Sequence, residues 1–105
     1  MLNYQQTYNH SEYVNCRDIA DFAKIYNFRD KSGVILGRNK IFRILRQLSI
    51  LDKNNTPYQS YMKYFKTIEK QYFKGDFGIK KIVVFVTPDG QSFLARKIND
   101  YLEMH

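Results

Sequence analysis

The sequence has few of the residues that build covalent links or metal sites. Its 105 residues include one cysteine, Cys16, two histidines, His10 and His105, and no tryptophan. One cysteine permits no disulfide within the chain, and two histidines in the outer parts of the sequence offer no zinc cluster. We therefore expect no metal and no cofactor, an idle or buried thiol at Cys16, and a reducing, intracellular compartment.

Long apolar segments and catalytic motifs are also missing. The longest apolar run, Ile82 to Val86, is much too short to span a bilayer, and the N-terminal residues contain no apolar core of a signal peptide. The sequence shows no paired carboxylates with apolar flanks, no glycine-rich phosphate loop and no Ser/His/Asp pattern. We therefore expect a protein that is not an enzyme.

Positive charge is concentrated in the middle of the chain. Residues 38–81 hold eleven Lys and Arg against three Asp and Glu, a net +8, whereas the other 61 residues hold six against seven, a net −1. A basic segment on a near-neutral body indicates a polyanionic partner. Asn, Ile, Lys, Phe and Tyr make up 46 of the 105 residues and have A/T-rich codons, so the placement of the lysines is better evidence than their number.

The patterned part of the chain, residues 13–105, is predicted to be one domain behind a tail or short lead-in helix of residues 1–12. A first helix is predicted over about 16–27, with Asn15 as its N-cap. Its apolar side chains at helical spacing are Ile19, Phe22, Ala23 and Tyr26. A polar turn over 29–33 and a short extended piece over 34–36 follow it.

The segment over about 38–49 has two faces when it is placed on a helix of about 100° per residue. The apolar face suits a core, and it holds Ile41, Ile44, Leu45 and Leu48, with Phe42 at its margin. The opposite face carries Arg, Lys, Asn and Gln side chains, whose donors and acceptors suit phosphates and base edges. This helix is therefore either a DNA-recognition helix or an ordinary solvated surface helix.

A hairpin and a last helix are predicted beyond a turn at residues 54–57. Two strand-like runs, 64–73 and 79–87, are joined by a polar link over 74–78 that contains two glycines, a pattern typical of a β-hairpin. The residues that open the last helix are Thr87 as the cap, Pro88 at the first position and Asp89 near the positive end of the dipole. Its predicted buried stripe is Phe93, Leu94, Ile98, Tyr101 and Leu102.

The predicted order of helix, turn, basic helix, hairpin and helix is an α+β fold of the winged-helix type. In that fold the second helix enters the major groove of DNA, and we expect the hairpin to lie along the neighbouring backbone. The predicted DNA-binding residues of the helix are Arg38, Asn39, Lys40, Arg43, Arg46 and Gln47. The predicted phosphate contacts of the hairpin are Lys66, Lys70, Lys74, Lys80 and Lys81.

Three separated strings, LGRNKIFRILRQ, NNTPYQSYMKYFK and VTPDGQSFL, resemble in this order the C-terminal KilAC domain of phage antirepressor proteins. DIADFAKIY fits the opening helix of that family, so the resemblance covers about residues 13–98. It implies a small DNA-binding-like module of a phage or prophage regulator, acting in the bacterial cytoplasm in the switch between lysogeny and lytic growth. The matching positions expected to form framework are Gly37, Phe42, Leu45, Pro57, Pro88 and Gly90.

The chain departs from the family pattern at two places. The segment Tyr61 to Phe65 is shortened, so the start of the hairpin is expected to differ. The family domain usually follows a distinct N-terminal domain, and here only about a dozen residues precede it. The chain is therefore either an excised domain or a small stand-alone regulator.

Two functions remain open from the sequence. One is sequence-selective binding of duplex DNA, in which a homodimer would occupy two half-sites. The other is a protein-interaction module that captures a repressor or another phage or host protein. The seventeen Phe and Tyr residues exceed what a small core comfortably hides, and tyrosine is enriched at interfaces. Tyr4, Tyr8 and Tyr13, however, lie in or beside the predicted tail, where codon bias explains them equally well.

Overall fold

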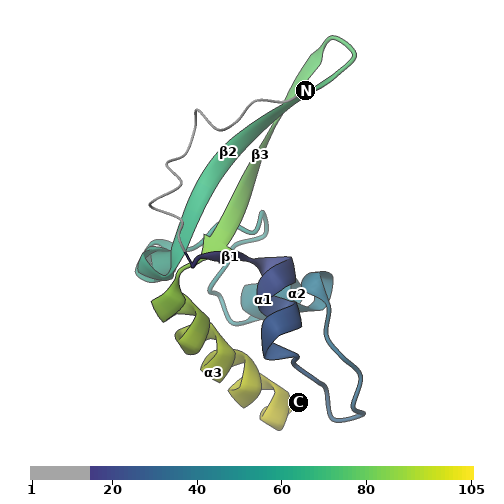
Figure 1. The fold of residues 1–105 in the computed structure, drawn as a ribbon, viewed down its shortest axis with the longest axis vertical. Helices are drawn as coiled ribbons and strands as arrows, with labels where there is room; N and C mark the ends of the chain where they lie inside the picture. The colour runs from purple at the N-terminus through teal and green to yellow at the C-terminus, as the bar shows by residue number, and fades with distance from the viewer. Residues whose placement is uncertain (1–14) are drawn as a thin grey trace.

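The structure, a computed structural model, describes residues 15–105. These residues form an α+β fold of three α-helices, one 3-10 helix and a three-stranded antiparallel sheet of order β1-β3-β2. Figure 1 shows a long hairpin of two strands standing away from the packed helices. The predicted tail of residues 1–12 lies outside the described residues. The elements are β1 (Arg17–Asp18), α1 (Ile19–Tyr26), α2 (Arg38–Gln47), η3 (Gln59–Tyr64), β2 (Phe65–Lys74), β3 (Phe77–Val86) and α3 (Pro88–Met104).

Helix α1 begins later than the sequence predicts. Its N-cap is Asp18, whose carboxylate accepts a hydrogen bond from the backbone N–H of Asp21 at 2.8 Å, so the prediction of Asn15 as the cap is wrong. The physical reason is a non-local strand: Arg17 and Asp18 form β1 and pair with the end of β3. Extended backbone at these two residues prevents the helix from starting at residue 16.

Helix α2 is also shorter than the predicted range 38–49, because a Schellman motif ends it. Ser49 has a left-handed backbone with φ 58°, its N–H donates to the carbonyl of Arg46, and the N–H of Ile50 donates to the carbonyl of Leu45. The reversal carries Ile50 and Leu51 back into the core, where each is 1% exposed. Leu48, predicted to be buried, is only partly buried at this turn.

The predicted turn at residues 54–57 is confirmed. The Asp52 carboxylate accepts hydrogen bonds from the backbone N–H groups of Asn54 and Thr56 at 2.8 and 3.0 Å, and Asn55 has a left-handed φ of 63°. The 3-10 helix η3 follows this turn, where the sequence analysis predicted only an altered start of the hairpin. Strand β2 therefore starts at Phe65 rather than at residue 64.

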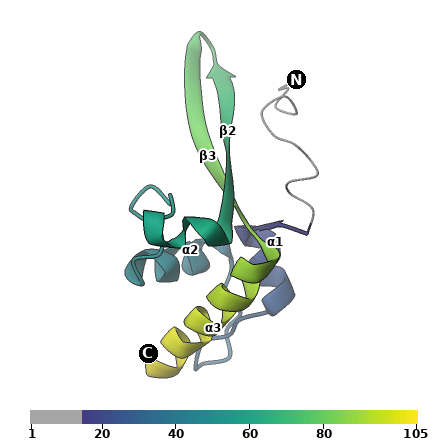
Figure 2. The ribbon, with the colours of Figure 1, turned by 90° about the vertical axis from the view of Figure 1, so that its left-hand side faces the viewer.

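The predicted hairpin is present, with a tighter turn. Lys74 pairs with Phe77, so the connection is the two residues Gly75 and Asp76 rather than five. Gly75 has a φ of 64° at the first central position, as a type II′ turn requires. At the base of the hairpin Phe65 and Val86 enter the core, whereas every residue from 71 to 82 is exposed. The outer part of the hairpin therefore stands clear of the helices, as Figure 2 shows.

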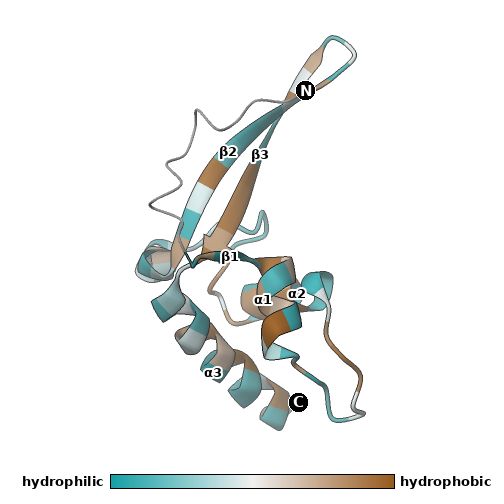
Figure 3. Cartoon of the chain, in the orientation of Figure 1, coloured by the Kyte–Doolittle hydropathy of each residue, from teal (hydrophilic) through white to brown (hydrophobic). Residues whose placement is uncertain are grey.

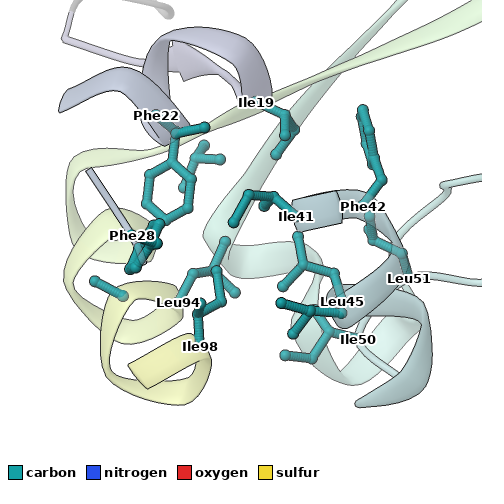
Figure 4. Close-up of a cluster of buried hydrophobic side chains, with 14 of the residues drawn as sticks. Ile19, Phe22, Phe28, Ile41, Phe42, Leu45, Ile50, Leu51, Leu94 and Ile98 are labelled. Atoms are coloured by element: carbon teal, nitrogen blue, oxygen red, sulfur yellow. The ribbon is translucent and has the colours of Figure 1, made fainter. Parts of the chain in front are cut away.

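The core lies between the three helices and the base of the sheet (Figure 4). Thr87 caps α3 as predicted, since its hydroxyl accepts a hydrogen bond from the backbone N–H of Gly90 at 3.0 Å. Of the predicted stripe on α3, Leu94 and Ile98 are fully buried, and the other three members pack partly buried against the core. The largest fully buried side chains are Phe22, Ile19, Ile41, Leu45, Ile50, Leu51, Leu94, Ile98 and Val86.

Candidate nucleic-acid interface

Helix α2 has the two faces that the sequence predicts. Ile41 and Leu45 are 0% exposed and Ile44 is 5% exposed, whereas Asn39 and Arg43 are on the solvent side. Phe42, predicted at the margin, is itself buried, and the Arg38 guanidinium lies 4.7 Å from the centre of its ring. A planar cation stacked on an aromatic ring is held in place while its outer edge stays in water.

The start of α2 concentrates positive charge. Gly37 is its N-cap and supplies no side-chain acceptor, and the first turn contains no acidic residue. Arg38 and Lys40 therefore lie at the end of the helix where the backbone dipole is also positive. This arrangement reduces the stability of the isolated helix and favours an anion in front of it.

Two of the predicted DNA-binding residues of α2 make hydrogen bonds to residues outside the helix. The half-buried Arg46 donates from Nη1 to Oδ1 of Asn55 at 2.6 Å, in the turn that follows α2. The Tyr101 hydroxyl of α3 donates to the side-chain carbonyl of Gln47. Arg46 and Gln47 therefore hold α2 against its neighbours, and no sequence pattern indicates the partner of either residue.

A groove of about 610 Å³ lies where α2 meets the hairpin. Arg38 and Phe42 of α2 line one part of it, and Lys80 and Lys81 of β3 line another. Asp18 is the acidic residue among its lining residues, against these three cations. The structure thus brings together two basic elements that are about forty residues apart in the sequence. We call this space, with Arg38, Lys80 and Lys81, the basic groove.

Other cations of α2 lie on a different side. Lys40 and Arg43 line a separate hollow of about 180 Å³, together with Lys31, Tyr101 and other residues. The exposed cations of α2 are therefore divided: Arg38 lies in the basic groove, and Lys40 and Arg43 lie towards the end of α3.

The hairpin lysines do not share one face. Side chains alternate along a strand, and directly paired residues point to the same side. In the observed register Lys70 lies opposite Lys81, and Lys74 and Lys66 belong to the same side, which we call the lysine face. Lys80 points to the other side, where its ammonium lies 3.9 Å from the Glu69 carboxylate. Both side chains of that pair are well exposed, so the pair contributes little stability.

The structure exposes aromatic residues at the end of the hairpin that no sequence motif indicated. Phe73 and Phe77, on either side of the hairpin turn, are 70% and 75% exposed, and Tyr72 is 38% exposed. The available signal was their position: aromatic residues next to a polar two-residue turn lie too far from a small core to be covered.

Among residues 15–105, no group of three or more His, Cys, Asp and Glu side chains is placed to hold a metal ion. Burial raises the pKa of the Cys16 thiol, and the nearby charge of Lys66 only partly opposes this, so the thiol is held protonated. Within the same described range, the helices are too short or too polar to cross a membrane.

Comparison with known proteins identifies the family. A family model described as the phage antirepressor protein KilAC domain matches residues 7–101 of this chain. No match was found among curated proteins, and none among solved structures. Because the family model covers nearly the whole sequence, including α2, the hairpin and most of α3, the chain belongs to the phage antirepressor KilAC domain family.

Proposed function

We propose that this protein is a phage regulatory protein that binds duplex DNA through α2 and the β2–β3 hairpin, without catalysing a reaction. The observation that carries the proposal is the basic groove, because it joins the N-terminal end of α2 to the hairpin and is lined by Arg38, Lys80 and Lys81. A cationic groove of this kind focuses positive potential on one side of the molecule and attracts a polyanion.

We further propose that the fold is a variant of the winged-helix type. Helices α1 and α2 are joined by the loop 27–37, which contains a β-bridge between Arg29 and Ile35, and a two-stranded hairpin follows α2. Two elements are additional in this chain, namely β1 before α1 and η3 between α2 and the hairpin. In this interpretation the exposed side of α2, with Asn39 and Arg43, faces the major groove, and the hairpin lysines contact phosphates.

The direct test is recovery of bound fragments from phage or prophage DNA by the purified chain, followed by variant measurements on the recovered site. Arg43→Ala is expected to lose about 1–3 kcal/mol of specific affinity and to relax the selectivity at one base position. Lys80→Ala and Lys74→Ala are expected to weaken binding to all DNA alike and to lower the salt slope by about 1.

Lys24→Ala is the matched control, because Lys24 is an exposed lysine in the last turn of α1 and lies outside the basic groove. It is expected to leave the salt slope unchanged. Binding that does not weaken between about 50 and 200 mM salt contradicts a phosphate-based interface. The stoichiometry on the recovered site reports in the same experiment whether two copies bind two half-sites.

The alternative is a module that binds a repressor or another phage or host protein. The observation that favours it is a set of exposed apolar side chains around the end of α1 and the following loop, where Ile25, Val34 and Ile35 are 50–52% exposed. Figure 3 shows these stretches as apolar. If an Arg43→Ala/Arg46→Ala double variant stays folded and binds DNA as the parent does, but loses a protein partner, this alternative is correct and the DNA proposal is wrong.

A further inference from the structure

The tip of the hairpin carries a phenylalanine, Phe77, that lies outside the hydrophobic core. Phe77 is 75% exposed and follows the two-residue turn directly, opposite Lys74 in the register. Phe73, on the other side of the ribbon, is also exposed, but its ring lies 3.6 Å from the position of a Cβ added to Gly78, its cross-strand partner. An aromatic ring over a cross-strand glycine has a packing role in the sheet. Phe77 lies on the opposite side from that contact.

Phe77 belongs to the lysine face, where a pair without lysine lies between two pairs that contain lysine. From the turn towards the body, the successive pairs on this face are Lys74 with Phe77, Tyr72 with Ile79, and Lys70 with Lys81. The two pairs that contain lysine are separated by about 14 Å along the strands, at about 3.4 Å per residue. No Asp or Glu of either strand belongs to this face. The chemistry of the face therefore combines attraction for phosphates with exposed aromatic and aliphatic surface.

The hairpin is long enough to carry Phe77 into a DNA groove. From the pair Glu69–Ile82 to the pair Lys74–Phe77 the ribbon extends over about 17 Å, at about 3.4 Å for each of the five steps. All residues from 71 to 82 are exposed, so no helix of the described fold stands between this part of the ribbon and a partner.

We propose that Phe77 is an apolar wedge that inserts between adjacent base pairs of the duplex bound by the lysine face. Apolar side chains on basic proteins unstack a base step in this way and kink the duplex. The energy of unstacking depends on the DNA sequence. The wedge therefore makes the protein select base steps that deform easily, without contacts to base edges at that step. This inference rests on the proposed DNA-binding function and adds a specificity-determining residue to it.

The test compares two short duplexes of the same mixed sequence, one fully paired and one with a central mismatch beside a 2-aminopurine base. A mismatched step is easier to unstack, so the parent protein is expected to bind that duplex about tenfold more tightly and to raise the 2-aminopurine fluorescence. Phe77→Ala is expected to lose the preference and the fluorescence change, while its salt slope stays that of the parent. Phe77→Leu is expected to keep part of both signals, because leucine is also an effective wedge.

Phe73→Ala is the matched control, since it removes the same kind of side chain from the adjacent pair of the ribbon, on the opposite face. It is expected to keep the mismatch preference and the fluorescence change. If Phe77→Ala keeps both signals, or if Phe73→Ala loses them equally, the wedge assignment is wrong, although DNA binding stands. If the single strand of the same sequence binds more tightly than either duplex in a Phe77-dependent manner, the tip stacks on single-stranded bases and the duplex wedge is wrong. If the parent binds none of these DNAs, the proposed function itself fails.

Discussion

Gly90 occupies the point where the end of η3 comes closest to α3, and its replacement by alanine tests the packing there. A Cβ at this position would lie 2.3 Å from the backbone oxygen of Tyr64, 2.9 Å from the Tyr64 Cβ and 3.0 Å from the Thr87 hydroxyl oxygen. The Tyr64 carbonyl accepts hydrogen bonds from the backbone N–H and the hydroxyl of Thr87 at 3.0 and 3.2 Å. It therefore cannot move away without weakening the cap of α3.

Alanine is a better helix former than glycine by about 1 kcal/mol, so the intrinsic effect of Gly90→Ala is stabilising. Overpacking costs about 1–3 kcal/mol, and each distorted hydrogen bond costs about 0.5–1.5 kcal/mol. The net expectation is a loss of about 2 kcal/mol of unfolding free energy, which lowers the melting temperature by about 8–16 °C in a domain of this size.

The assay is thermal and urea unfolding of the purified protein, followed by circular dichroism. Gly37→Ser is the control, because a Cβ at Gly37 meets nothing within 4 Å and serine is at least as good an N-cap as glycine. That variant is expected to unfold within a few tenths of a kcal/mol of the parent. An unchanged melting temperature for Gly90→Ala would refute the close contact between η3 and α3.

Three other predictions concern α2 and its surroundings. Leu45→Ala is expected to lose about 2–5 kcal/mol of stability because the side chain is fully buried, whereas Arg43→Ala is expected to lose very little; equal melting temperatures would mean that the helix faces are misassigned. Ser49→Gly is expected to stabilise the protein by about 1 kcal/mol in urea unfolding, because glycine adopts the left-handed C′ conformation without a Cβ penalty. A double-mutant cycle of Arg46→Ala and Asn55→Ala is expected to show a coupling energy of about 0.5–3 kcal/mol, and additive effects would contradict the hydrogen bond.

The faces of α2 could be predicted from the sequence because helical periodicity is a local property. The start of α1 could not, because residues 17 and 18 are extended only through their pairing with Val86 and Phe85, nearly seventy residues away. The end of α2 was also missed, since Ser49 rather than glycine adopts the left-handed conformation that ends the helix.

The distribution of the hairpin lysines could not be predicted without the register. A five-residue link over 74–78 would pair Phe73 with Ile79, whereas the observed two-residue turn pairs Phe73 with Gly78. A slip of one residue exchanges the faces of one strand relative to the other. The link length predicted from the sequence would have placed Lys80, and not Lys81, on the side of Lys70. The tight turn therefore decides which lysine completes the lysine face.

Two residues of the last family string, VTPDGQSFL, hold the base of the hairpin in position. Gln91 is buried, and its amide donates to the carbonyls of Val86 at 3.2 Å and Asn15 at 2.9 Å, so it ties α3 to the end of β3 and to the segment before β1. Gly90 allows Tyr64, the last residue of η3 before β2, to approach the same turn of α3. The outer hairpin is exposed on both faces, so these contacts at its base set its direction relative to α2. In the proposed function, a change at Gln91 would therefore weaken DNA binding by moving the hairpin lysines, although Gln91 itself is buried away from any DNA.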